Sequence, residues 1–238
     1  MSIKQLAMRL VYGHKASSEQ YISWLRSQGV HVGQHVHLYT PWSIRIDTQR
    51  PWMIEIGDNV HITADCSILQ HDYSWAVIQR LTGEVLGSCG TVRIGNNVFV
   101  GQKSLILKGA EIGDNTIIGA GSVVTGRLDG NAVYAGAPAK KISSLEAYID
   151  KRRKLQLNEA VLLVREYEQT YGKRPPKSYF GNSSGCLSLG TLSWMRYSKR
   201  FSSLITIPNV HSKRLFKANL CLAAMRHSSN TLNQILNS

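Results

Sequence analysis

The sequence predicts a mainly β fold: a single-stranded left-handed parallel β-helix of hexapeptide repeats, with an N-terminal helical segment, a protruding loop at about residues 69–93 and a C-terminal helical extension. Two observations carry this prediction. An aliphatic residue recurs at every sixth position in two long blocks, and the two blocks are out of phase. The chain of 238 residues is long enough for one well-filled domain with extensions.

The period of six runs through most of residues 32–124. The second block holds an aliphatic residue at six successive positions: Ile94, Val100, Ile106, Ile112, Ile118 and Val124. The first block has the same spacing with one break, at Arg50: Val32, Leu38, Ile44, Ile56, Ile62 and Ile68. Neither a helix nor a simple strand has this period. We expect three six-residue segments to form one triangular coil, with the aliphatic side chains inside and the coils stacked at about 4.8 Å.

Glycine follows several of the aliphatic positions, at Gly95, Gly101, Gly113 and Gly119. We expect these glycines to supply the positive φ angles of the corners, which residues with a Cβ rarely adopt. The repeat residues therefore build the scaffold and perform no chemistry.

The phase shift between the blocks predicts an insertion at residues 69–93. We divide the chain into an N-terminal helical segment (1–31), a β-helix domain with the inserted loop (32–142), a long amphipathic helix (143–176) and a basic C-terminal extension (177–238). Ser17 with Gln20, and Ser143 with Glu146, have the spacing of capping boxes. The first predicts a helix over Glu19–Ser27 that stops at Gly29.

The net charge of +13 is concentrated near the C-terminus. Residues 1–31 carry four basic and one acidic side chain, residues 32–144 carry nine of each, and residues 145–238 carry fifteen and five. Such an extension suits an anionic membrane surface. We expect no nucleic-acid binding, because the basic run Lys151–Lys154 lies on a helix with an apolar opposite face and no nucleic-acid-binding fold accompanies it.

The N-terminal sequence and the cysteines indicate the cellular compartment and whether the protein binds a metal. The N-terminus has no uninterrupted apolar region like that of a signal peptide. Four scattered cysteines form no CxxC pair, so we expect reduced thiols, no metal and a cytoplasmic protein.

One residue stands out for chemistry. His71 opens the insertion, in the run Gln70-His71-Asp72-Tyr73. An imidazole suits deprotonation of a hydroxyl near neutral pH, and function tends to lie on loops held by a rigid scaffold. Either Asp72 or a backbone carbonyl could orient the second ring nitrogen.

Longer motifs resemble those of the bacterial hexapeptide-repeat acyltransferases, in the branch of the maltose, galactoside and nodulation-factor acetyltransferases and the polysaccharide O-acetyltransferases. The resemblance covers roughly residues 32–142. Its most specific runs are residues 118–125 (Ile-Gly-Ala-Gly-Ser-Val-Val-Thr) and residues 135–140 (Ala-Gly-Ala-Pro-Ala-Lys), preceded by residues 98–101 and 106–115.

This resemblance implies an O-acetyltransferase that uses acetyl-CoA as co-substrate, with His71 as general base and no covalent acyl-enzyme. It implies a homotrimer that binds acetyl-CoA between subunits. The donor-site residues it implies are Phe99, Gly101 and Gln102 along the acyl and pantetheine arm, Ala120 at the pantetheine amides, and Thr125 and Lys140 toward the nucleotide. Phe99 replaces a tryptophan that is frequent in the family. Gly126 stands where a basic residue is common, so Arg127, Lys140 or Lys141 would compensate.

The implied acceptor is a sugar hydroxyl of a surface polysaccharide or its lipid-linked precursor, met in the cytoplasm at the inner face of the membrane. Tyr73, Trp75 and Trp42 are candidates to stack on sugar rings, or else to pack the loop. Two alternatives stay open. One is a zinc enzyme resembling the trimeric carbonic anhydrases of this fold, using histidines such as His35, His37, His61 and His71. The other is a non-enzymatic β-helix that binds or scaffolds partners.

Overall fold

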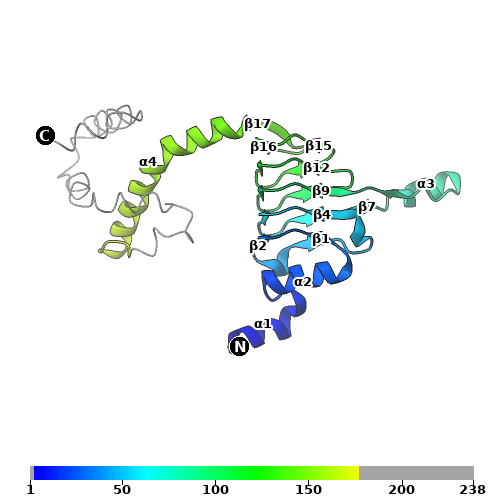
Figure 1. Ribbon diagram of the computed structural model, residues 1–238, viewed down its shortest axis with the longest axis horizontal. Coiled ribbons are helices and arrows are strands. Elements are labelled where there is room, and N and C mark those ends of the chain that lie inside the picture. The colour runs from blue at the N-terminus through cyan, green and yellow to red at the C-terminus, as the bar shows by residue number, and fades with distance from the viewer. Residues whose placement is uncertain (1–2, 177–238) are drawn as a thin grey trace. The chain divides into compact units, whose positions relative to one another are not determined.

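The computed structural model describes residues 3–176. The chain divides into two compact units between Ile149 and Asp150, and each is described by itself. The first unit contains a stack of triangular coils, which Figure 1 shows edge-on, with short strands on three faces. The mainly parallel β-helix predicted from the period of six is thus confirmed.

Three parallel sheets, here called A, B and C, form the faces. Sheet A contains β1 (His31–Val32), β4 (Ile54–Ile56), β9 (Val92–Ile94), β12 (Glu111–Ile112) and β15 (Arg127–Leu128). Sheet B contains β2 (His37–Leu38), β5 (His61–Ile62), β10 (Val98–Val100), β13 (Thr116–Ile118) and β16 (Ala132–Ala135), and β17 (Lys140–Ser144) adds to β16 in antiparallel orientation. Sheet C contains β3 (Arg45–Ile46), β6 (Ser67–Ile68), β11 (Leu105–Ile106) and β14 (Val123–Val124).

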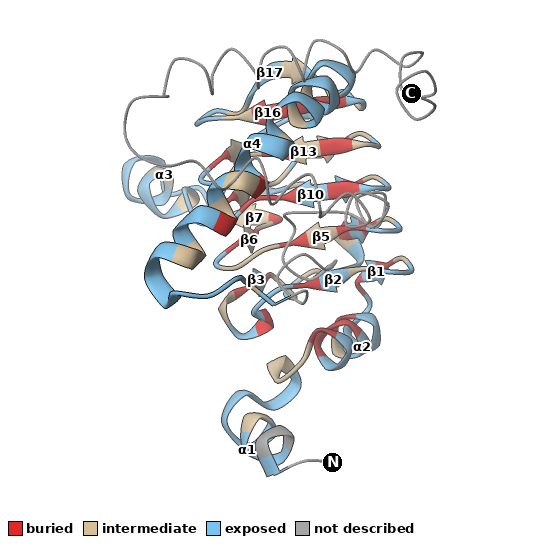
Figure 2. Ribbon diagram, turned by 90° about the vertical axis from the view of Figure 1, so that its left-hand side faces the viewer, coloured by how far each residue is buried: buried red, intermediate tan, exposed pale blue. Residues whose placement is uncertain are grey.

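The aliphatic positions of the repeat form the core. Residues of successive coils pair in register, as Ile62 does with Val100 and Val100 with Ile118. All twelve aliphatic residues of the two blocks are buried, and Figure 2 shows buried segments on strand after strand along the stack. Burial of this continuous apolar column is the main force that holds the short strands together.

The first coil is longer than a regular coil, and the period of six in the sequence does not reveal the extra length. Val32 pairs with Ile56, twenty-four residues later, whereas Ile94 pairs with Ile112, eighteen residues later. The six extra residues lie in two 3₁₀ turns, η2 (Pro41–Ser43) and η3 (Pro51–Met53). Because the excess is itself six, the phase is preserved. The strand residue that pairs with Ile68 is Ile46, which is not one of the repeat positions, and the repeat position Ile44 is buried just before the strand.

The expectation for the glycines was wrong. None of Gly95, Gly101, Gly113 and Gly119 has a positive φ. They are required because successive coils approach closely: a Cβ on Gly113 would lie 2.4 Å from the backbone nitrogen of Gly130. The left-handed conformation is instead adopted by asparagines at the corner between sheets A and B: Asn59, Asn97, Asn115 and Asn131. Their side-chain amides hydrogen-bond in a ladder, with distances of 2.9, 2.7 and 3.0 Å.

The inserted loop leaves the β-helix at the corner between sheets C and A. It consists of β7 (His71–Asp72), α3 (Trp75–Thr82) and β8 (Ser88–Cys89), and Figure 1 shows it as an arm that projects from the coils. Strands β7 and β8 pair in antiparallel orientation, with His71 opposite Cys89. Five residues on this arm are large, apolar and exposed: Tyr73, Val77, Leu81, Val85 and Leu86.

The N-terminal segment contains α1 (Ile3–Tyr12), the 3₁₀ turn η1 (Gly13–Lys15) and α2 (Ser18–Gln28). The hydroxyl of Ser17 accepts a hydrogen bond from the amide of Gln20 at 3.3 Å, and Gly29 ends α2 with a φ of 99°, as the sequence predicts. Helix α2 packs on the first coil through Tyr21 and Leu25, which belong to the same buried core.

Helix α4 (Leu145–Tyr171) follows β17 and continues into the second unit. Ser143 lies within β17, and it is the hydroxyl of Ser144 that accepts a hydrogen bond from the amide of Ala147 at 3.2 Å. The predicted cap therefore lies one residue later. No helix among the described residues is both long and apolar enough to cross a bilayer. The extension 177–238 lies outside the described residues.

Candidate active site

His71 is held at the point where the arm leaves the β-helix. It is the first residue of β7, and the carbonyl of the preceding Gln70 accepts a hydrogen bond from the amide of Gly90 at 2.9 Å. This hydrogen bond joins the two ends of the arm close to the end of strand β6 in sheet C. The side chain of His71 is 10% exposed. The ring is therefore fixed by its surroundings while one edge still reaches the surface.

Asp47 supplies a carboxylate beside the imidazole. It follows β3 in the first coil, and its amide donates to the carbonyl of Ile68 in the next coil at 3.0 Å. Its Oδ2 lies 2.6 Å from Nδ1 of His71, and its side chain is also 10% exposed. A carboxylate at this distance attracts the positive charge that the ring gains when it accepts a proton during general-base catalysis.

Gln70 is the second neighbour of Nδ1. Its side chain is fully buried, and its Oε1 also lies 2.6 Å from Nδ1. Nδ1 forms a hydrogen bond with this amide oxygen. Asp47 Oδ2, at the same distance, accepts no hydrogen bond from a described residue. Two acceptors on one side of the ring place the proton on Nδ1 and leave Nε2 unprotonated, so that Nε2 can act as a base.

The sequence offered Asp72 or a backbone carbonyl to orient His71, but the groups next to Nδ1 are the side chains of Gln70 and Asp47. The Asp72 carboxylate binds the ammonium group of Lys108 and the hydroxyls of Ser74 and Ser88. The hydrogen bond from Lys108, followed by those from Ser74, lowers the pKa of Asp72 well below its usual value. Asp72 therefore stays ionised and fastens the base of the arm to the loop that holds Lys108, while Asp47 and Gln70 surround the histidine.

Aromatic rings extend from the exposed edge of the site. Tyr73 contacts His71 edge to face, with the ring centroids 4.8 Å apart, and Trp75 follows at 6.4 Å from Tyr73. The amide of Gln49 donates to the hydroxyl of Tyr73 at 2.9 Å. Trp42, in contrast, stacks on Tyr12 of α1 at 5.3 Å. Of the three aromatic residues considered from the sequence, Tyr73 therefore adjoins the histidine and Trp75 adjoins Tyr73.

Four of the six donor-site residues come together at the corner between sheets B and C. Phe99 is exposed on the outer face of β10, and Gly101 and Gln102 follow it directly. Ala120 occupies the same corner one coil later, so close that a Cβ on Gly101 would lie 2.5 Å from its backbone nitrogen. The amide of Gln102 donates to the carboxylate of Asp65 at 3.3 Å.

The remaining predicted residues lie elsewhere. Lys140 is exposed on β17, opposite Ala135 on the edge of sheet B. Thr125 is exposed after β14, at the corner between sheets C and A. His71 occupies that same corner. The four residues Phe99, Gly101, Gln102 and Ala120, here called the Phe99 group, lie at the other end of the strands of sheet C. A single chain therefore does not bring His71 and the Phe99 group into one pocket.

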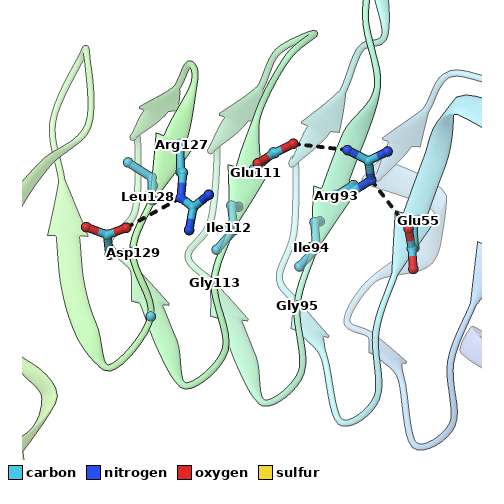
Figure 3. Close-up of a pocket in the computed structure, with 11 residues that line it drawn as sticks. Glu55, Arg93, Ile94, Gly95, Glu111, Ile112, Gly113, Arg127, Leu128 and Asp129 are labelled. Atoms are coloured by element: carbon cyan, nitrogen blue, oxygen red, sulfur yellow. Dashed lines mark hydrogen bonds and ion pairs between the residues drawn. The ribbon is translucent and has the colours of Figure 1, made fainter.

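The outer face of sheet A is charged. Glu55, Arg93, Glu111 and Arg127 alternate in sign on neighbouring strands around a shallow pocket of about 440 Å³, which Figure 3 shows. Arg93 lies 3.0 Å from Glu111 and 3.7 Å from Glu55. Glu55, Arg93 and Arg127 are exposed and Glu111 is half-buried, so these pairs add little to stability. Arg127, which the resemblance offered as a substitute phosphate contact, lines this pocket, whereas His71 and the six donor-site residues do not.

The outer faces of sheets B and C are less polar. Sheet B presents His37, His61, Phe99 and Ile117 along paired strands, and sheet C presents one charged residue, Arg45, followed by Ser67, Leu105 and Val123. Burial lowers the pKa of His61, with a further contribution from His37, which favours a neutral ring there. The three faces thus differ in character, and the charged one is sheet A.

Potential metal ligands are dispersed in the described part of the chain. Within residues 3–176, no three histidine, cysteine, aspartate or glutamate side chains gather in a group that could hold a metal ion. The zinc alternative concerns ligands shared between subunits, so it stays untested.

Comparison with known proteins places the chain in a family. Residues 91–126 match the family described as bacterial transferase hexapeptide (six repeats). Protein CapG from Staphylococcus aureus is 35% identical over 153 residues, which cover 61% of this chain and 88% of that protein. The chain belongs to the bacterial hexapeptide-repeat transferases. The family predicted from the motifs is thus confirmed.

Two acetyltransferases are also similar to this chain. Galactoside O-acetyltransferase from Escherichia coli (strain K12) is 31% identical over 133 residues, which cover 56% of this chain and 63% of that enzyme, just under two thirds. A solved structure, a maltose O-acetyltransferase from Clostridium difficile 630, is 27% identical with a TM-score of 0.45, over 59% of this chain and 83% of that chain.

Sequence reasoning missed Asp47 as a site residue and gave Gln70 no role. The position of Gln70, adjacent to His71 at a phase break, was a usable signal. Asp47 had none, because its place beside the histidine depends on the six extra residues of the first coil.

Proposed function

We propose that this chain transfers an acetyl group from acetyl-CoA to a hydroxyl of a sugar, with His71 as general base. The observation that carries the proposal is the environment of the imidazole: Asp47 and Gln70 both face Nδ1, and the ring adjoins an exposed aromatic wall. Membership of the hexapeptide-repeat transferases and the 31% identity to a galactoside O-acetyltransferase support the reaction class.

The reaction is a direct transfer. Nε2 of His71 removes the proton from the acceptor hydroxyl while its oxygen attacks the thioester carbonyl carbon. The imidazolium that forms is stabilised by the carboxylate of Asp47. When the tetrahedral intermediate collapses, the carbon–sulfur bond breaks and the imidazolium proton passes to the leaving thiolate. No acyl-enzyme is needed, and Cys66, fully buried in the core with a raised pKa caused by that burial, is not a nucleophile.

The donor site lies between two copies of the chain in a homotrimer. Phe99, Gly101, Gln102 and Ala120 of one subunit bind the acyl and pantetheine arm, facing His71 of its neighbour, and Thr125 and Lys140 lie toward the nucleotide. Two observations support this arrangement. Within one chain, His71 and these four residues lie at different corners of the β-helix. In addition, sheet B has an apolar and aromatic outer face that could pack against another subunit, whereas the outer face of sheet A is charged and suited to contact with solvent.

The acceptor is a saccharide of surface polysaccharide biosynthesis. Support comes from Tyr73 and Trp75, whose rings continue from His71 along the arm and offer apolar faces of the kind on which sugar rings stack. We place the enzyme in the cytoplasm, at the inner face of the membrane. The part assigned to the basic extension 177–238 is tested by vesicle binding after its deletion, and unchanged binding would remove that assignment.

The function is tested by following the release of free CoA from acetyl-CoA with a panel of sugars. His71→Ala should lower kcat by about a hundredfold or more while the affinity for acetyl-CoA is retained, because only the base is lost. The matched control is His31→Ala, which removes an exposed histidine from sheet A and should leave kcat unchanged. Wild-type turnover by His71→Ala would overturn the mechanism. Absence of acetyl-CoA binding by the wild-type protein in calorimetry would favour a binding or scaffolding role instead.

A further inference from the structure

Helix α1 presents an apolar face that no described residue covers. Ile3, Leu6, Leu10 and Val11 recur at the spacing of one helical face, and their side chains are between 47% and 89% exposed. Soluble surfaces rarely expose such a contiguous apolar stripe without a partner.

The charge around this helix is positive. The first eighteen residues contain Lys4, Arg9 and Lys15 and no acidic residue. Residues 1–50 contain six basic and two acidic side chains, whereas residues 51–144 contain seven and eight. The excess positive charge of the β-helix unit therefore belongs to its N-terminal end, independently of the basic extension.

The helix is fastened at its C-terminal end. Tyr12 stacks on Trp42 of the first coil, and His14 stacks on Trp24 of α2 with the ring centroids 3.9 Å apart. The ammonium group of Lys15 donates to the carbonyl of Ile44 at 2.7 Å. These contacts join α1 to the first coil and to α2, and none of them uses the apolar face.

The first coil adds an exposed aromatic residue. Trp52, in the 3₁₀ turn η3, is 74% exposed, and Arg50 directly precedes this turn. An indole beside basic residues is the combination enriched where proteins meet the interfacial region of a bilayer.

We propose that α1 docks this protein on an anionic lipid surface. The helix lies in the plane of the interface, with Ile3, Leu6 and Leu10 among the upper acyl chains and Arg9 at the lipid phosphates. Amphipathic helices with a basic polar face bind membranes in this way without spanning them. A second copy of the chain is a less suitable occupant, because the positive N-terminal segments of two copies repel each other whereas anionic headgroups attract them. This inference goes beyond acetyl transfer and does not rest on it.

The test is co-sedimentation of the full-length protein with phosphatidylcholine vesicles, with and without phosphatidylglycerol. The wild-type protein should bind the anionic vesicles, and added salt should weaken binding. Leu10→Glu should lower the partition coefficient by about tenfold or more, because it places a charge among the acyl chains. Arg9→Glu should lower it as well, through the headgroup contact.

The matched control is Leu81→Glu on α3, since Leu81 and Leu10 are 81% and 80% exposed. This variant should bind like the wild-type protein. Equal binding by wild type and Leu10→Glu would overturn the proposal and assign membrane binding to other residues. Dissociation of the lipid-free assembly by Leu10→Glu, measured by analytical ultracentrifugation, would also overturn it, because α1 would then be covered by a second copy.

Discussion

The carboxylate of Asp47 lies 2.6 Å from Nδ1 of His71, although the two residues belong to successive coils and are brought together only by the stacking of β3 on β6. Nδ1 forms its hydrogen bond with Gln70, and Oδ2 of Asp47 accepts none from a described residue. The two side chains next to Nδ1 thus have different roles. Gln70 holds the proton on Nδ1, and Asp47 stabilises the positive charge that develops on the ring.

Replacing Asp47 with asparagine should lower kcat by roughly tenfold to a hundredfold, less than loss of the histidine itself, because the imidazolium loses its counter-charge while the base remains. The KM for acetyl-CoA should change little. Steady-state kinetics with acetyl-CoA as the varied substrate measures both. An unchanged kcat would show that Asp47 serves only the fold.

A shared site predicts complementation between two inactive variants. His71→Ala and Phe99→Glu should each be inactive alone, the first for want of a base and the second because a carboxylate blocks the acyl arm. Mixed assemblies formed from equal amounts by unfolding and refolding should recover up to about one quarter of wild-type activity, since one quarter of neighbouring pairs combine an intact His71 with an intact Phe99. If both residues acted within one chain, mixing would restore nothing.

The clamp at the base of the arm predicts a pH-dependent loss of stability. The pKa of Asp72 is lowered in the folded protein, so its interaction with Lys108 stabilises the fold above the usual carboxyl pKa and is lost as the pH falls toward the lowered value. Asp72→Asn should therefore melt below the wild-type temperature at neutral pH. The difference in Tm should shrink in acid, and scanning calorimetry across that range would reveal a constant difference if the clamp were irrelevant.

Close approach of the coils predicts opposite outcomes for two glycine substitutions. Gly113→Ala should destabilise the protein by about 1–3 kcal/mol, because its Cβ would meet the backbone of Gly130 at 2.4 Å. Gly87→Ala, on the arm, meets nothing within 4 Å and has no positive φ, so it should be neutral or slightly stabilising. Denaturant unfolding compares the two, and equal effects would contradict the packing argument.

The sequence predicted the parts of the fold that repeat. Ile94 to Val124 have a regular period because every coil of eighteen residues returns to the same face, and the shift after Ile68 marked the arm. It misjudged features that depend on contacts between coils. Glycine and asparagine both occur at corners, and only the stacked backbone shows that Gly101 avoids a clash whereas Asn97 adopts the left-handed turn.

The residues of the candidate site likewise include one that the sequence indicated and one that it did not. His71 was recognisable because it stands where a period ends. Asp47 was not, because the first coil contains six extra residues whose number leaves the period intact, so that nothing in the spacing indicated which residue would face the imidazole.

Strand β17 turns back along β16 and pairs with it in antiparallel orientation. A stack of parallel coils has an open edge at its last turn, and an open edge can accept the first coil of another molecule, as growing cross-β fibres do. By reversing direction, β17 occupies the edge of sheet B with its own backbone. The chain thereby limits its own length and keeps a structure that is repetitive by construction from polymerising end to end.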